Sequence, residues 1–193
     1  ALGLVAISMV LGQPAMADDS KKITACVTGG GFYEKVIGVV SNRLKAEGYD
    51  VVISNDSTGS PDSLERFSGK ECNLTIVQGD AVSLYGASVP LDSVTVQAHT
   101  EAVMWITNVD AKYKNLDAVE DMEDAVLVVP GGSGAEVTLK ALAKEENDYE
   151  VVLKNAKTTD DYYEAAEAVA NGYINKGGRR YKVAGMIYPI RPG

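Results

Sequence analysis

Three short, glycine-rich turns are the part of this sequence best suited to binding chemistry. Each follows an apolar run and precedes a stretch with helical spacing, at residues 28–33, 57–61 and 130–134. Glycine lets the backbone bend there, so that N–H groups at the positive end of the next helix can approach a ligand closely. Such amides favour a carboxylate or a phosphate. The alternative is simple helix capping, as in the pair Ser133 and Glu136, which has the spacing of a capping box.

Nucleotide and hydrolytic chemistry have little support. The dinucleotide fingerprint would need glycine three residues after Gly31, where Glu34 stands, and no Gly-Lys-Ser/Thr sequence occurs. The single histidine, His99, is interpreted as structural, and no Ser has the Gly-x-Ser-x-Gly context of a nucleophile. One His and two Cys are too few for a structural zinc site. We therefore expect no catalytic residue, no cofactor and no metal ligand, although carboxylates alone could hold a hard cation.

Composition and charge indicate a folded, soluble protein. The chain has 193 residues, of which 46% are hydrophobic and 23% charged, and a mean hydropathy of -0.05. Its formal net charge is -9, and neither sign is gathered into a long block. Nonspecific binding to nucleic acid or to an anionic membrane is therefore not expected.

The first residues have the pattern of a secretory signal peptide. Residues 1–11 are apolar and uncharged, and Pro14 is followed by Ala15, Met16 and Ala17, which suit a cleavage site. The apolar run is about half of the roughly 20 residues that a membrane span needs. We expect cleavage after Ala17 and a periplasmic mature protein. The alternative, a buried N-terminal helix, is disfavoured by its Gly and Pro residues.

Export would permit a disulfide between the two cysteines, Cys26 and Cys72. The predicted strands that carry or precede them are neighbours in a parallel sheet. In that register the two sulfur atoms are several residues out of step, which favours buried thiols. The sequence leaves both states open.

Strands and helices alternate along the chain. Strands are predicted at 23–28, 49–54 and 74–77. Helices are predicted at 32–47 and 60–69, and a short third helix follows Asp80 and ends at residue 85. After extended runs at 93–97 and 102–107, strands are predicted at 125–129, 149–153 and 182–188, with helices at 135–146 and 159–171. This order predicts an α/β fold with mainly parallel sheets and right-handed crossovers. We expect lobe 1 at 18–98, lobe 2 at 99–193, a hinge at 98–101, and truncation of the second lobe and its return segment.

Four motifs together resemble one family. They are Thr28-Gly29-Gly30-Gly31-Phe32-Tyr33, Thr58-Gly59-Ser60 with Leu64 and Gly69, Val77-Gln78-Gly79-Asp80-Ala81, and Gly132-Ser133-Gly134. This combination is similar to the TAXI family of periplasmic solute receptors, which serve TRAP transporters, and it covers roughly residues 23–193. The Gln-x-Asp-Ala element is its most specific part. The chain departs from the family at Asp62, Asn73 and Ala135, and the last of these lacks a hydroxyl that the family pattern has.

The resemblance implies a type II periplasmic-binding-protein-like fold, in which two α/β lobes close on an organic acid or amino acid. The ligand would pass to the membrane permease subunits of a TRAP transporter, and the receptor would be a monomer without enzymatic activity. Asp80 would repel a carboxylate unless it receives an ammonium group or organises backbone. Alternatives are a periplasmic hydrolase or isomerase, or a sensor domain, on the same scaffold. The turns and the family motifs together give these expected ligand-binding residues: Gly30, Gly31, Tyr33, Thr58, Ser60, Gln78, Asp80, Gly132, Ser133 and Gly134.

Overall fold

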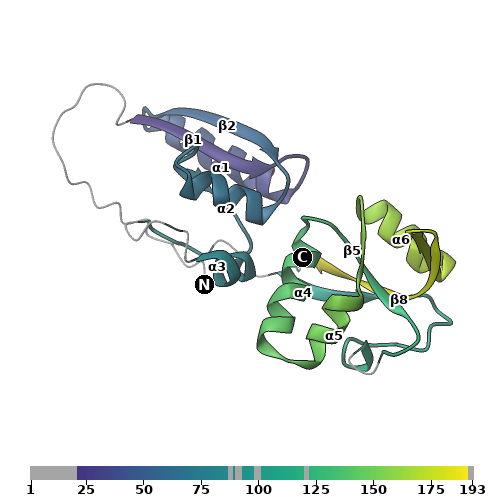
Figure 1. Ribbon diagram of the computed structural model, residues 1–193. Helices are drawn as coiled ribbons and strands as arrows, with labels where there is room; N and C mark the ends of the chain where they lie inside the picture. The colour runs from purple at the N-terminus through teal and green to yellow at the C-terminus, as the bar shows by residue number, and fades with distance from the viewer. Residues whose placement is uncertain (1–20, 87–88, 90–92, 98–100, 120–121, 191–193) are drawn as a thin grey trace, which may run out of the picture.

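The computed structural model describes residues 21–86, 89, 93–97, 101–119 and 122–190 (Figure 1). The predicted signal peptide at 1–17 and His99 lie outside the described residues, as do three of the four residues of the predicted hinge. Among the described helices, none combines the length and the apolar character that crossing a membrane requires.

The first lobe is a parallel three-stranded sheet in the order β2-β1-β3. Its strands are β1 (Lys22–Thr28), β2 (Asp50–Ser57) and β3 (Leu74–Thr75), and α1 (Phe32–Ala46) and α2 (Ser60–Ser68) connect them. The predicted alternation of strand and helix is confirmed here, with β3 shorter than expected. Ala25 and Val27 of β1 pack with Ile37 of α1 in a small core.

The second lobe is built on a sheet of mixed direction in the order β4-β8-β5-β6. Strand β5 (Val126–Pro130) runs parallel to β6 (Lys157–Thr159) and β8 (Arg179–Ile190), whereas β4 (Ala102–Ile106) runs antiparallel to β8. Side chains of β5 alternate between two cores, with Leu127 and Val129 facing α4 (Gly134–Glu145) and α5 (Asp148–Asn155), and Val126 and Val128 facing α6 (Tyr162–Asn171). Burial on both faces accounts for the continuous apolar run.

Helix α3 (Gly79–Tyr85) connects the two lobes in space. It packs against α2 of the first lobe and α4 of the second (Figure 1). At the α4 side, the Nζ of Lys144 donates to the carbonyl oxygen of Ser83 at 3.3 Å. The turns after β2 and β5 also meet here, since a Cβ atom on Gly59 would lie 2.1 Å from the carbonyl oxygen of Gly132.

In the second lobe one predicted strand is wrong, and another is confirmed but was predicted too short. The strand predicted at 149–153 is helix α5, in which Tyr149 and Val152, three residues apart, are buried against α4 while Val151 is exposed. Its acidic first turn and Lys154 in the last turn suit the helix dipole. The strand predicted at 182–188 is the longer β8, and it forms a hairpin with β7 (Tyr173–Lys176), which the sequence reading missed.

The expectation of buried free thiols is also wrong, because Cys26 and Cys72 form a disulfide with their Cα atoms 5.8 Å apart. Cys26 pairs with Thr75 in the parallel ladder, as the register argument assumed. However, the chain before β3 folds back over β1. The backbone N–H of Asn73 donates to the carbonyl of Thr24 at 3.0 Å, and the N–H of Thr24 donates to Oδ1 of Asn73 at 2.9 Å. These bonds hold Cys72 beside Cys26.

Candidate functional site

A cavity of about 1140 Å³ lies beside α3, where the two lobes meet. Its polar lining includes Tyr33 from α1, Gln78 and Asp80 at the start of α3, Glu101 just before β4, and Thr138 from α4. The rest of its wall is largely apolar and comes from α2, β3 and residues 93–97. A concave, mostly apolar site with a few polar groups is the usual form of a small-molecule site.

Glu101 is the polar centre of this cavity. Its Oε1 accepts a hydrogen bond from the hydroxyl of Tyr33 at 2.9 Å, and its Oε2 accepts one from Nε2 of Gln78 at 3.2 Å. Two residues that were expected to bind a ligand therefore hold a carboxylate of the chain itself. The sequence reading missed Glu101 because it fell in the predicted hinge. The sequence signal that could have indicated Glu101 is its position as a lone carboxylate directly before an apolar strand.

Gln78 joins the two lobes at the edge of the cavity. Its backbone N–H donates to Oγ of Ser60 at 3.1 Å, and both residues are buried. A Cβ atom on Gly134, the first residue of α4, would lie 2.3 Å from Oε1 of Gln78. The side chain of Gln78 therefore packs directly on the start of a helix of the second lobe, where only glycine leaves space. Ser60 is the first residue of α2, whose N-cap is Gly59.

Asp80 has partners in both lobes. Its Oδ1 accepts from the N–H of Ala81 at 2.9 Å, and its Oδ2 accepts from Oγ1 of Thr138 at 2.8 Å. The first bond organises the backbone of α3, which is one of the two roles expected for Asp80. The second ties α3 to α4.

The three glycine turns already hold carboxylates of the chain. The N–H of Gly30 donates to Glu34 at 2.6 Å, that of Thr58 to Asp62 at 2.9 Å, and that of Gly132 to Glu136 at 2.6 Å. The acidic residue lies four positions after the amide in each case, in the first turn of α1, α2 and α4. At these amides helix capping explains the turns. In addition, Oγ of Ser133 accepts from the N–H of Glu136, as predicted.

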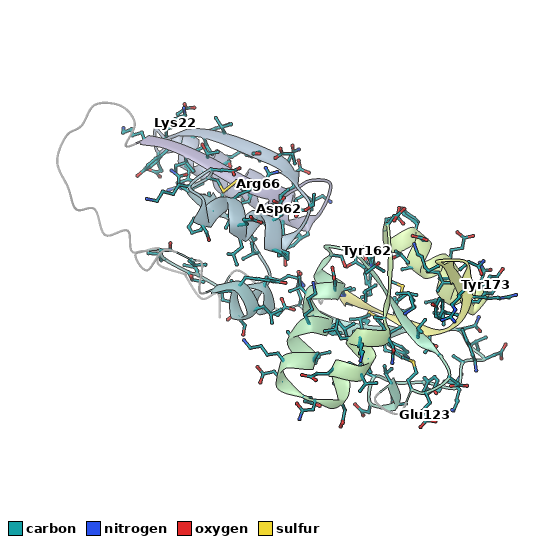
Figure 2. All side chains as sticks on the ribbon, viewed as in Figure 1. Lys22, Asp62, Arg66, Glu123, Tyr162 and Tyr173 are labelled. Carbon is teal, nitrogen blue, oxygen red and sulfur yellow. A yellow bond between two sulfur atoms is a disulfide. The ribbon has the colours of Figure 1, made fainter. Side chains whose placement is uncertain are left out.

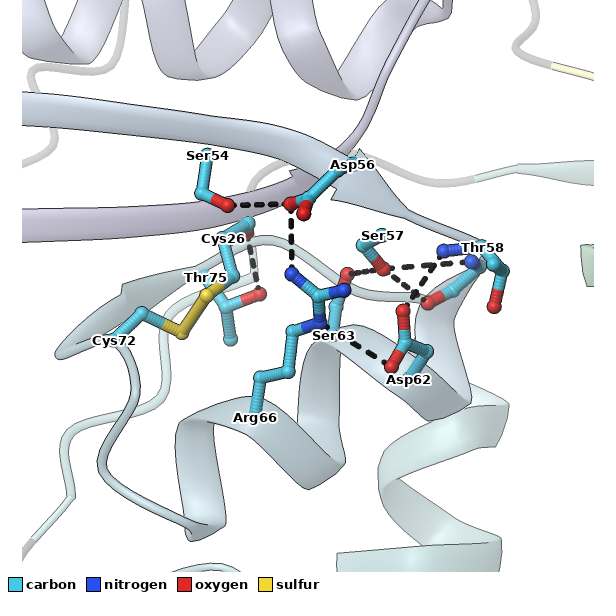
Figure 3. A network of polar contacts seen from close by, with 11 residues as sticks. Cys26, Ser54, Asp56, Ser57, Thr58, Asp62, Ser63, Arg66, Cys72 and Thr75 are labelled. Carbon is cyan, nitrogen blue, oxygen red and sulfur yellow. Dashed lines mark hydrogen bonds and ion pairs between the residues drawn. A yellow bond between two sulfur atoms is a disulfide. The ribbon is translucent and has the colours of Figure 1, made fainter.

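A polar network fixes the second turn (Figure 3). The guanidinium of Arg66 bonds to Oδ1 of Asp56 at 2.7 Å and to Oδ1 of Asp62 at 3.3 Å. Beneath the turn, the hydroxyls of Ser57 and Ser63 lie 2.6 Å apart. The N–H of Thr58 is the main cause that holds the pKa of Asp62 below its usual range, and Arg66 adds to it. The network therefore needs Asp62 ionised.

Two tyrosines, Tyr33 of the first lobe and Tyr162 of the second, border the region where the lobes meet. The hydroxyl of Tyr162 accepts from the N–H of Ala135 at 3.3 Å, and its ring meets that of Tyr188 edge-on at 4.9 Å. Figure 2 shows Tyr162 on the side of the second lobe that faces the first. Burial raises the pKa of both Tyr33 and Tyr162, and the charge of Glu101 adds to each rise. Both phenols are therefore neutral at physiological pH.

The expected site residues fall into three groups. Tyr33, Gln78 and Asp80 line the cavity, while Ser60 and Gly134 contact Gln78. Thr58, Gly132 and Ser133 lie where the second and third turns meet, and a Cβ atom on Gly59 would be 2.1 Å from the carbonyl oxygen of Gly132. Gly30 and Gly31 are exposed and do not line the cavity. Within the described residues, no three His, Cys, Asp or Glu side chains converge as a metal site.

Two solved structures are similar to this chain. Drosophila muscle GluRIIB in complex with glutamate has a TM-score of 0.51 and 10% identity, over 77% of this chain and 69% of that one. A proposed methionine-binding lipoprotein from Bacillus subtilis has a TM-score of 0.48 and 16% identity, over 90% of this chain and 71% of that one. The chain matches no protein-family model and no curated protein. It has the predicted fold, which is α/β and like that of type II periplasmic binding proteins.

Proposed function

We propose that this protein is an extracytoplasmic receptor that captures a small organic acid or amino acid between its lobes. The observation that supports this best is the cavity where the lobes meet, which is lined by Tyr33, Gln78 and Asp80 of the TAXI-like motifs together with Glu101 and Thr138. The receptor would deliver its ligand to the permease of a TRAP transporter and would catalyse no reaction. Residues 1–17 would be its signal peptide, with lobes at 18–98 and 99–193.

Among these ligands the geometry favours an amino acid. The cavity contains two carboxylates, Glu101 and Asp80, whereas Lys70 is its only basic residue among those described. A purely anionic ligand would meet like charge there, and two unit charges 4 Å apart interact by about 1 to 4 kcal/mol under solvated to half-buried conditions. An ammonium group would instead complement Glu101. Apolar walls then leave room for a side chain.

The test is a thermal-shift experiment with matched pairs of ligands: glutamate with glutarate, and aspartate with succinate. We expect one of the amino acids to raise Tm by several degrees, and its deaminated partner to raise it less. Glu101→Gln should remove this preference, because the amide keeps the size of the side chain but loses the charge. Glu167→Gln, at an exposed position on α6, is the control and should bind as wild type does.

The two parts of the proposal fail in different ways. If no acid or amino acid in a broad panel shifts Tm, the receptor function is wrong. If glutarate or succinate binds better than its amino acid partner, the receptor stands and the preference for an ammonium group is wrong.

A further inference from the structure

The β7–β8 hairpin of the second lobe is strongly basic, although the protein is acidic. Residues 173–182 contain no Asp or Glu, and their cations are Lys176, Arg179, Arg180 and Lys182. Removing these four positive charges from the net -9 leaves -13 on the rest of the chain. The hairpin is therefore positively charged, whereas the rest of the chain has a net negative charge. Figure 2 shows Tyr173 of this hairpin at the end of the second lobe that is far from the first lobe.

The hairpin presents cations on both of its faces. Residues that are directly opposite in an antiparallel pair share a face, so Lys176 and Arg179 lie on one side, and Asn175 and Arg180 on the other. Gly177 and Gly178 form the two-residue turn with φ of 59° and 74°, which this kind of tight turn requires. The tip therefore carries no apolar side chain.

Two of the four cations are neutralised within the protein and two are not. Lys176 lies 3.3 Å from Glu164 of α6, and Lys182 lies 3.1 Å from Asp124. Both arginines are exposed, and neither has a carboxylate within 4 Å among the described residues. Arg180 instead stacks on Tyr173, with its guanidinium carbon 3.6 Å from the ring centre. This contact fixes the orientation of the N–H donors of the Arg180 guanidinium group.

Lys176 and Arg179 are like charges directly opposite each other, and the ion pair with Glu164 offsets their repulsion. Within the described chain, β7 pairs only with β8, so its other edge is left with unpaired backbone groups. Cations beside such an edge repel a second copy of the same strand, which protects against self-association. The same cations attract an extended segment of opposite charge.

We propose that the outer edge of β7 is a docking site for an acidic, extended segment of a partner protein, with Arg179 and Arg180 of the adjacent strand β8 on the two faces of the hairpin. The segment would add a strand to β7, and its carboxylates would reach across β7 to the guanidinium groups on the two faces of the hairpin. An anionic membrane fits less well. A flat membrane surface would also face the net charge of -13 on the rest of the chain. The tip of the hairpin, Gly177 and Gly178, has no apolar side chain to insert into the membrane.

The experiment measures binding of a fluorescent ten-residue peptide of alternating Glu and Thr to the full chain. We expect binding that weakens as salt rises, and that becomes at least ten-fold weaker in Arg179→Glu/Arg180→Glu. The control Lys35→Glu/Lys45→Glu makes the same change in net charge at exposed positions of α1 and should bind as wild type does. A peptide with an N-methyl group on every residue should bind at least ten-fold more weakly, because neither of its edges can donate backbone hydrogen bonds to β7.

Three results would overturn the proposal: no binding of the Glu/Thr peptide, equal binding by wild type and the arginine double variant, or equal binding of the N-methylated peptide. Vesicles containing phosphatidylglycerol form a separate arm. Binding of the hairpin to vesicles without binding of the peptide would assign the site to lipid and would also overturn it.

Discussion

At the scale of single residues, Tyr33 reports on the charge of the cavity. Its hydroxyl donates to Glu101, and partial burial, followed by the charge of Glu101, places its pKa well above the usual range. Below about pH 10 the phenol is neutral in the folded and unfolded states, so its contribution to stability is fully present. Above that pH the unfolded chain ionises first, and the contribution is lost as pH rises towards the folded-state pKa.

Tyr33→Phe should therefore lower the free energy of unfolding by about 1.5 to 3 kcal/mol below pH 9, because Glu101 loses a hydrogen-bond donor. The difference from wild type should shrink above pH 10. Urea unfolding at pH 8, 9 and 10.5 measures it. Tyr163→Phe, at a position 86% exposed, is the control and should show almost no difference. A difference that grows above pH 10 would contradict the assigned pKa.

At the scale of elements, the disulfide fixes the loop that leads into β3. Cys26 and Cys72 are 46 residues apart in sequence and both are buried. Closing a loop of this length restricts the unfolded chain by roughly 4 kcal/mol in the entropic model, within a measured range of about 2 to 5 kcal/mol for native bridges. The segment before β3 also depends on the bonds of Asn73 to Thr24, which remain without the bridge.

Cys26→Ala/Cys72→Ala should lower the free energy of urea unfolding by 2 to 4 kcal/mol while the fold persists. Dithiothreitol should destabilise wild type towards the same value and leave the double variant unchanged. Equal stability of wild type and variant under oxidising conditions would mean that the bridge does not constrain the unfolded chain.

The helices and strands also show which parts of the fold could be predicted from the sequence. The first lobe was predictable because strand, glycine turn and amphipathic helix follow each other with their local signals intact. Helix α5 was not, because Tyr149 to Leu153 has the β-branched composition of a strand and becomes helical by packing on α4. Tyr33, Gln78 and Asp80 were predicted from motifs. Glu101 was not, because only tertiary structure brings it to Tyr33.

At the scale of the whole molecule, the lobes approach each other through residues without side chains. A Cβ atom on Gly59 would meet the carbonyl oxygen of Gly132, and one on Gly134 would meet the side chain of Gln78. Polar bonds from Asp80 to Thr138 and from Lys144 to Ser83 span α3 and α4 nearby. Two-lobed receptors respond to ligand by shifting between open and closed populations, so contacts at this junction set that balance.

Gly59→Ala should therefore open the molecule. The new Cβ would lie 2.1 Å from a backbone oxygen, which has no flexible side chain to move, so one of the two turns must shift. We expect a larger radius of gyration in small-angle X-ray scattering, without loss of helical circular dichroism. Gly38→Ala is the control, because a Cβ there meets nothing within 4 Å. It should leave the radius unchanged and stabilise α1 by about 0.5 to 1 kcal/mol. If Gly59→Ala scatters as wild type does, the two turns are not in contact in solution.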